Sequence, residues 1–482
     1  MNKIIALLNT YVTGLLEAEE KFVCDLSGFP DLEKEVVELS NRMAAGFLGV
    51  CLTTADELIR MSGARKDAFT VQRSRDRTLI SSVGDITFKH TLYKDPDGRI
   101  RCLLDEQIRL PDRERFTSVA EAKLLNEAEV HSYRHAAESI STGSQTVTKT
   151  TVMNKVHAVE EEIPDMTPIP EEEEKKKCRY LYIEADEDHI HRQENGENKG
   201  CFIGKLAYLF EGKEEVSKDR RRLIAPFYFG GLYGGPKSNA QFWEMIEKYI
   251  ESHYDTEYLK RVYISGDGGS WIRASVDYID KSRFVADRYH LMKYIYRAAG
   301  YTLDNKNETV GRFYKYIYKN RPVSAKKLLT RIENHCEGSE KAVDECRTFL
   351  LGNWDAIQTA FHDKHALGCS AEGHVSNVLS ERMSSRPMGW SATGTDRMCK
   401  LRCFVRNYGR EKVIDLVQYR REKEMMQYAA TGTEGMIDGE ARRHFSKEQQ
   451  QARSYIERMQ ATLALNSTAR KTLAIREQIR LI

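Results

Sequence analysis

The fold of this chain is decided by two stretches, RYLYIEAD at residues 179–186 and KRVYISGDGG at residues 260–269. Each is rich in β-branched and aromatic residues and reaches an aspartate, Asp186 or Asp267, which predicts a buried strand that leads to an acid. Period-two alternation places Glu184, Asp186 and Asp188 on one face of the first strand. Asp188 therefore remains an alternative to Asp186.

Further elements lie between and after these two strands. Their composition and spacing predict strands at CFIGKLAYLF (201–210), RLIAPFYFGGLYGG (222–235) and SRFVAD (282–287), and helices at KSNAQFWEMIEKYIESHY (237–254) and WIRASVDYI (271–279). The resulting order is three strands, helix, strand, helix, strand. In the ribonuclease-H-like fold, three antiparallel strands precede two parallel strands with crossover helices in this order. We therefore predict an α/β protein whose ribonuclease-H-like catalytic core contains a mixed five-stranded sheet.

The other regions follow from composition and periodicity. The core is expected at 178–287 and again at 368–390, where CSAEGHVSNVLSERM (369–383) predicts its last helix. Residues 288–367 are basic and aromatic and predict an all-helical insertion. The remaining regions are a helical N-terminal region (1–70), a small β unit (71–114), a helix-turn-helix-like DNA-binding region (115–160), an acidic linker (161–177) and a basic helical C-terminal region (391–482).

Three carboxylates are the candidate catalytic and metal-binding residues. The first and fourth strands lie side by side in the predicted fold, so Asp186 and Asp267 would meet, although Asp267 could instead serve an ordinary turn. On a helical wheel Glu372 continues the apolar stripe of the last core helix, which predicts that it faces the sheet. Carboxylates suit Mg²⁺, a hard cation for which Mn²⁺ can substitute. We expect two such ions, as phosphodiester chemistry by paired metals requires.

The insertion begins with ADRYHL (286–291), in which Asp287 is the expected N-cap and a further candidate acid. Residues 281–330 contain 12 Lys or Arg against 3 Asp or Glu, interleaved with aromatic residues. This mixture suits a nucleic-acid surface, although a helical bundle with a solvated basic face would look alike. The candidate DNA contacts are Arg288, His290, Lys293 and Arg297.

Composition excludes several classes of protein. No run of 18 apolar residues occurs, so we expect no membrane span. The ten cysteines are scattered without the spacing of zinc ligands, which indicates reduced, buried thiols in a cytoplasmic protein.

Several motifs together carry a family resemblance. They are VGDITFKHTLY, LLDE, SYRHAA, YIEADEDHIH, ISGDGGSWI, FVADRYHLMKYI and EGHVSNVLSERMSSRPMGWS. Over about residues 70 to 395 the chain resembles the Lre-type bacterial insertion-sequence transposases, which are distantly related to the Mutator-like transposases. The resemblance implies a ribonuclease-H-like core with a helical insertion. Its matching acids are Asp186, Asp267 and Glu372, and His290 stands where Mutator-like enzymes keep a histidine, without their partner cysteine.

The resemblance also implies a function. A DDE transposase cuts DNA at the terminal inverted repeats of its element and joins the freed 3′ ends to target DNA. The partners would be these two DNAs, held by at least a homodimer, and the location would be the bacterial cytoplasm, at the nucleoid. Two alternatives remain: a metal-dependent nuclease of the same fold without strand transfer, and an inactive transposase-derived DNA-binding regulator.

Overall fold

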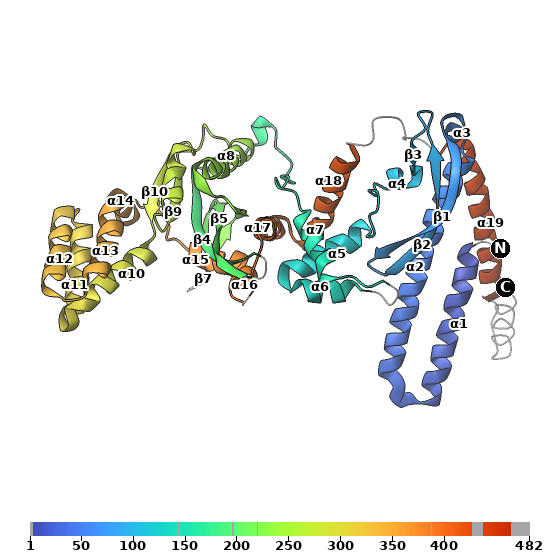
Figure 1. Cartoon of the computed structure of the whole chain (residues 1–482), viewed down its shortest axis with the longest axis horizontal. Helices are drawn as coiled ribbons and strands as arrows, with labels where there is room; N and C mark the ends of the chain where they lie inside the picture. The colour runs from blue at the N-terminus through green and yellow to red at the C-terminus, as the bar shows by residue number, and fades with distance from the viewer. Residues whose placement is uncertain are drawn as a thin grey trace. The chain divides into compact units, whose positions relative to one another are not determined.

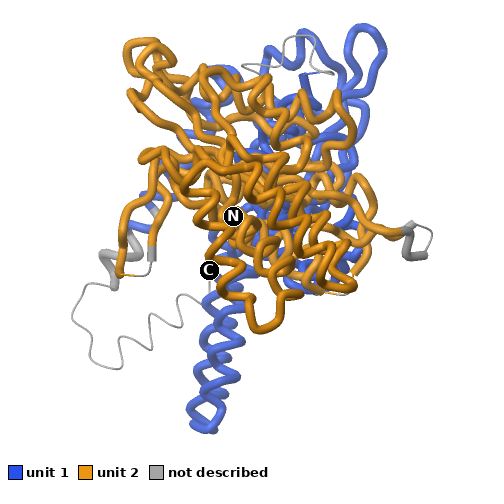
Figure 2. Tube along the Cα trace, turned by 90° about the vertical axis from the view of Figure 1, so that its left-hand side faces the viewer, with its two compact units in different colours: residues 1–128, 132–155, 414–482 blue, residues 129–131, 156–413 orange. Residues whose placement is uncertain are grey.

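The computed structural model describes residues 3–141, 145–194, 197–218, 220–386, 388–426 and 437–463 (Figure 1). The chain divides into two compact units (Figure 2). The first unit comprises residues 1–128, 132–155 and 414–482, and the second comprises residues 129–131 and 156–413. The part of the predicted C-terminal region (391–482) that follows residue 463 lies outside the described residues. Within the described ranges, no helix has the length and apolar character needed to cross a membrane.

The second unit is built on a mixed five-stranded sheet with the strand order β10-β9-β4-β5-β8 (Figure 1). The strands β4, β5 and β8 pair antiparallel, whereas β4, β9 and β10 pair parallel. Their bounds are Tyr180–Glu194 (β4), Glu197–Phe210 (β5), Phe227–Gly231 (β8), Arg261–Gly266 (β9) and Ser282–Ala286 (β10). The prediction of a mixed sheet with three antiparallel strands before two parallel ones is confirmed.

Alternation along β4 separates two faces of this sheet. Leu181, Ile183 and Ala185 are fully buried in one core cluster with Trp243 and other apolar residues of α8 (Gly235–His253). On the other face the helix α15 (Ala371–Val375) packs against β4, and α17 (Ala392–Tyr408) packs against β8. The acids of β4 therefore lie on the face that α15 covers.

One predicted strand is divided in the structure. The stretch 222–235 was expected to form a single strand, but β7 (Arg220–Ile224) ends before Ala225 and β8 begins after Pro226. Ala225 has a positive φ of 47°, which interrupts the extended backbone. As a result β7 pairs with β6 (Gly212–Ser217) in a separate two-stranded ribbon, and β8 alone joins the main sheet.

The predicted helical insertion is present between β10 and α15. It contains α10 (Arg288–Ala299), α11 (Lys306–Tyr318), α12 (Pro322–His335), α13 (Glu340–Gly352) and α14 (Trp354–His362). These helices bury their apolar faces in a core cluster of their own, which includes Ile295, Phe313 and Leu329. Short helical pieces complete the unit: η2 (Glu172–Glu174), α9 (Ser270–Arg273), η3 (Ala274–Asp277), η4 (Gly300–Asn305), η5 (Ser376–Ser380), α16 (Glu381–Met383) and η6 (Arg410–Lys412).

The first unit combines long helices with a small antiparallel sheet. The sheet contains β1 (Thr70–Ser81), β2 (Gly84–Lys94) and β3 (Ile100–Arg101), and α2 packs against β2. The predicted Asp-Pro-Asp-Gly turn connects β2 to β3, with Gly98 at a φ of 84°. The helices of this part of the chain are α1 (Lys3–Cys24), α2 (Phe29–Met61), α3 (Gly63–Ala68), α4 (Leu103–Gln107), α5 (Ser118–Val130), α6 (Tyr133–Ile140), α7 (Lys149–His157), α18 (Val413–Met426) and α19 (Gly439–Leu463).

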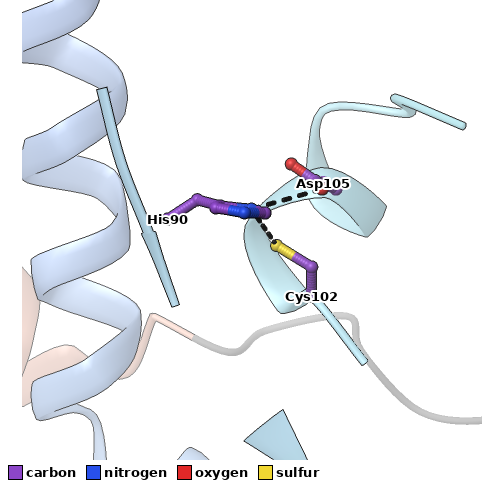
Figure 3. Close-up of side chains that lie close together, drawn as sticks. All are labelled: His90, Cys102 and Asp105. Atoms are coloured by element: carbon purple, nitrogen blue, oxygen red, sulfur yellow. Dashed lines mark hydrogen bonds and ion pairs between the residues drawn. The ribbon is translucent and has the colours of Figure 1, made fainter. Parts of the chain in front are cut away.

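A His-Cys-Asp cluster lies between the small sheet and α4 of the first unit, with His90 and Asp105 buried and Cys102 half-buried (Figure 3). His90 Nδ1 lies 3.2 Å from Cys102 Sγ and 3.5 Å from Asp105 Oδ2. Two arginines already bind these groups: Arg75 Nε donates to His90 Nε2 at 2.8 Å, and Arg77 forms an ion pair with Asp105. Cations held this close compete with a metal ion for the same ligands, so we assign the cluster a structural role.

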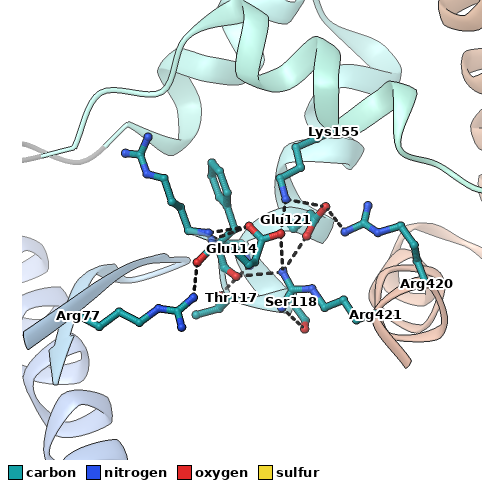
Figure 4. Close-up of polar contacts among 11 residues, drawn as sticks. Arg77, Glu114, Thr117, Ser118, Glu121, Lys155, Arg420 and Arg421 are labelled. Carbon is teal, nitrogen blue, oxygen red and sulfur yellow. Dashed lines mark hydrogen bonds and ion pairs between the residues drawn. The ribbon is translucent and has the colours of Figure 1, made fainter. Parts of the chain in front are cut away.

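A buried ionic network joins distant segments of the first unit (Figure 4). Glu121 of α5 is fully buried and pairs with Arg421 at 2.7 Å, Arg420 at 2.7 Å and Lys155 at 3.2 Å. Burial disfavours the charged carboxylate, but the charges of Arg420, Lys155 and Arg421 outweigh it and hold the pKa of Glu121 at about 2. The network attaches α18 to α5 although the two are about 300 residues apart in sequence.

All ten cysteines are free, as the scattered spacing predicted. Cys346, Cys399 and Cys403 are buried, whereas the other seven are half-buried or exposed, so the prediction of buried thiols is wrong for those seven.

Candidate active site

Asp186 lies on β4 and Asp267 directly follows β9, at matching positions of these adjacent strands. The parallel pairing of β4 with β9 ends at Glu184 and Ser265, and each aspartate follows two residues later. Asp186 accepts a hydrogen bond from the backbone N–H of Glu187 at 2.8 Å, and Asp267 Oδ1 accepts one from the N–H of Gly269 at 2.8 Å. The sheet thus brings two acids together that are distant in sequence, as predicted.

Asp287 adds a third acid at the same end of the sheet. It follows β10, and its backbone N–H donates to the carbonyl of Gly266 at the end of β9. Its carboxylate caps α10 by accepting from the N–H of Tyr289 at 2.9 Å, and it contacts His290 Nδ1 at 2.8 Å. This hydrogen bond raises the pKa of His290, and the charges of Asp287, Asp186 and Asp267 act in the same direction. His290 therefore lies among the three acids.

Among the described residues, no lysine or arginine forms an ion pair with the acids at this end of the sheet, and the ion-pair partner of Asp287 is His290. Burial and the neighbouring charge of Asp267 together raise the pKa of Asp186 to about 6, although the hydrogen bond from the N–H of Glu187 and the charge of His290 act in the opposite direction. A raised carboxylate pKa that combines burial with a like charge is typical of functional sites. A divalent cation at this position would relieve the same repulsion.

Glu372 occupies an exposed edge of α15. Ala371 and Val375 bury the inner face of this helix, and Glu372 lies about 100° around the axis from Ala371. The helical wheel placed Glu372 in line with the apolar stripe, whereas the structure leaves it exposed at the edge of the buried face. The reason is η5, a π-helical turn at Ser376–Ser380, which shifts the helical phase of Leu379 and Met383 relative to α15. Such turns are frequent at functional sites.

Two other acids of β4 anchor the segment that carries Glu372. The buried Glu184 accepts bonds from the N–H of Ser370 at 2.6 Å and from Lys213 Nζ at 2.7 Å. Asp188 accepts bonds from the hydroxyl of Ser384 at 3.0 and 2.8 Å, just after α16. Asp186 lies between these two anchors on the same face. The period-two pattern predicted the shared face, but it did not reveal that the outer acids hold the helix.

The predicted DNA contacts of α10 divide into two kinds. Arg288 donates to the carbonyl of Ala360 and lies over the ring of Phe361, and Arg297 pairs with Glu345 at 2.6 Å. These two arginines therefore hold the insertion together. Lys293 is exposed on α10 and remains a candidate for a phosphate contact.

The donor set fits a hard divalent cation. Asp186 and Asp267 present carboxylate oxygens from rigid strands, Asp287 lies beside them, and their mutual repulsion favours a bound positive charge. Glu372 is accessible on the helix that packs against β4. Sequence reasoning identified Asp186 and Asp267 but treated Asp287 mainly as a helix cap. The signal for Asp287 was its position directly after a strand parallel to that of Asp267.

Comparison with known proteins places the chain in a family. A structural comparison matches the Drosophila P element transposase strand transfer complex at 9% identity over 69% of this chain and 97% of that chain, but its TM-score of 0.22 is too low to support an argument. Two UPF0236 proteins of Caldanaerobacter subterraneus subsp. tengcongensis are 33% and 31% identical to this chain. The first match covers 79% of this chain and 78% of the relative, and the second covers 83% and 84%.

A Streptococcus gallolyticus relative, described as a UPF0236 protein in the vanSb 3′ region, is 25% identical over 78% of this chain and 83% of its own length. The model of the uncharacterised protein family UPF0236 matches residues 25–419. The chain therefore belongs to the uncharacterised protein family UPF0236.

Proposed function

We propose that this protein is a DDE-type DNA transposase of the Lre type with a ribonuclease-H-like catalytic core. The observation that carries the proposal is the convergence of Asp186, Asp267 and Asp287 at one end of three neighbouring strands, with no arginine or lysine paired to them in the ion pairs of the described residues. The strand order supports the same fold, because it has three antiparallel strands before two parallel ones.

Asp186 and Asp267 would hold Mg²⁺, or Mn²⁺ in its place, with Glu372 as the third ligand. When bound, two such ions would activate the attacking oxygen and stabilise the leaving oxygen of a phosphodiester. Asp287 orients His290 through the hydrogen bond to Nδ1 and favours its protonated form. A protonated His290 would place a positive charge beside a DNA phosphate at this site.

The DNA substrates would be the terminal inverted repeats of an insertion sequence and a target duplex. Lys293 on α10 would contact a phosphate near the acids, and the basic character of residues 281–330 would supply the surrounding electrostatic attraction. Cutting and joining two element ends in one reaction requires at least two copies of the site. The protein would therefore act as a homodimer or a larger assembly on DNA.

A cleavage and joining assay tests this proposal and separates it from the two alternatives. Purified protein is incubated with Mg²⁺ or Mn²⁺, a labelled duplex that carries the element's own end, and a target plasmid. We expect metal-dependent cutting at the 3′ end of the element, followed by labelled products joined to the plasmid. Cutting without joined products would indicate a nuclease, and binding without cutting would indicate a regulator.

A further inference from the structure

The helix α10 exposes three large side chains on one face. Tyr289, Met292 and Tyr296 are 47%, 41% and 42% exposed. At 100° per residue they lie within about 60° of one another around the helix axis. The opposite face, with Leu291, Ile295 and Ala298, is buried in the core of the insertion. The buried face thus holds the helix in place, while the face with Tyr289, Met292 and Tyr296 stays open.

The aromatic face begins at the candidate active site. Tyr289 follows Asp287 by two residues, and its ring meets the ring of His290 edge-on at a centroid distance of 5.5 Å. From Tyr289 to Tyr296 the helix advances about 10 Å. The face therefore forms a path that leads away from the three acids along one helix.

The charges along this path are positive. Lys293 lies on the same side of α10, about 40° from Tyr289, and Lys306 Nζ lies over the ring of Tyr296 at 5.5 Å from its centroid. Aromatic rings with neighbouring cations form the type of surface that binds single-stranded nucleic acid, because bases stack on the rings while cations attract the phosphates. Bases inside a duplex are stacked on one another and are not available for such contacts.

We infer that Tyr289, Met292 and Tyr296 form a stacking platform for unpaired bases of the DNA strand beside the carboxylate site. The inference rests on the proposed function, since that function supplies the DNA. It adds that the substrate includes a single-stranded segment next to the scissile phosphate. A ring on this path would hold a base that has left the duplex, and Lys293 would contact its backbone.

Fluorescence quenching with 2-aminopurine tests the platform without any cleavage. The full chain is titrated, in EDTA, into a duplex with a short single-stranded overhang that contains 2-aminopurine, and in parallel into a blunt duplex. The variants are Tyr289→Ala/Tyr296→Ala, the ring-preserving Tyr289→Phe/Tyr296→Phe, and Tyr318→Ala. Tyr318 provides a matched control because it is 61% exposed and lies on α11.

We expect wild-type protein to quench the probe and bind the overhang DNA at least about tenfold more tightly than the double alanine variant, given the usual contribution of base stacking. The phenylalanine variant and Tyr318→Ala should behave as wild type, and blunt-duplex binding should be equal for all four proteins. The inference is overturned if wild type does not quench, if the double alanine variant binds the overhang normally, or if the phenylalanine variant loses as much as alanine. Because the assay needs neither metal nor cutting, failure of the transposase proposal would appear only in the cleavage assay.

Discussion

Glu121 in the first unit and Asp186 in the second are both carboxylates withdrawn from water, yet their surroundings differ. Three cations surround Glu121 and hold its pKa at about 2. Asp186 has another acid beside it, and burial raises its pKa to about 6. The first arrangement neutralises a charge within the fold, whereas the second leaves a charge that a bound cation can satisfy. This difference is the physical reason for assigning structure to one site and chemistry to the other.

Removing the charge of Glu121 should have the largest effect on stability. Glu121→Gln leaves Lys155, Arg420 and Arg421 without their shared partner, so we expect a loss of about 3–5 kcal/mol in the free energy of unfolding of the first unit. The folded pKa lies below the unfolded value, so this stabilisation is present above about pH 4.5 and disappears as the pH falls toward 2. Urea unfolding followed by circular dichroism measures the change.

The tryptophans make this test specific, because all four lie in the second unit. Tryptophan fluorescence should therefore report an unchanged transition in Glu121→Gln while circular dichroism reports an earlier one. Glu33→Gln, at an exposed position, should change the free energy of unfolding by less than about 0.5 kcal/mol. Equal stability of the two variants would show that the ion pairs of Glu121 do not stabilise the first unit.

Asp186→Asn should increase the free energy of unfolding in metal-free buffer, whereas Glu121→Gln should decrease it. The folded pKa of about 6 lies above the usual value of 3.8, so the charged form of Asp186 destabilises the fold. The penalty is absent below about pH 4, grows between pH 4 and 6, and is complete above pH 6. We expect the variant to be about 1–3 kcal/mol more stable than wild type at pH 7.5 and equal to it at pH 3.5. A destabilised variant at pH 7.5 would show that the charge of Asp186 is satisfied by the protein alone.

Mg²⁺ should stabilise the second unit through the same acids. At millimolar concentrations we expect it to raise the melting temperature reported by tryptophan fluorescence by about 2–4 °C in wild type. Glu121→Gln should retain this shift, and Asp186→Asn should lose it. Sodium chloride at matched ionic strength controls for screening, and an equal shift with this salt would argue against a specific site.

The smallest expected effect concerns a single phosphate contact. Lys293→Ala should weaken DNA binding and reduce by about 1 the slope of log affinity against log salt concentration. Lys260→Ala serves as the control because it is exposed just before the start of β9, at the opposite end of that strand from Asp267. If both variants showed the same slope, the basic surface of the insertion would not lie along the DNA.

Local patterns predicted most of the sheet and two of its acids. Strand composition located β4 and β9, and the strand order of the predicted ribonuclease-H-like fold placed Asp186 beside Asp267. The exposure of Glu372 was not predictable, because a π-helical turn breaks the regular 100° progression on which a helical wheel depends. The division at Ala225 depends on a backbone conformation that residue type alone does not specify. The network of Glu121 depends on partners from Lys155 to Arg421, whose proximity only the tertiary structure creates.

The most direct test of the central claim is the single-turnover rate at which the 3′ strand of the element's end is cut in Mg²⁺, measured for wild type, Asp267→Asn and Asp277→Asn. Asp277 is an exposed acid of η3 and provides the matched control. We expect Asp267→Asn to cut more than about a hundredfold more slowly, as expected when a group that stabilises transition-state charge is removed. Asp277→Asn should cut at the wild-type rate. Undiminished cutting by Asp267→Asn would contradict the assignment of these acids as the catalytic centre.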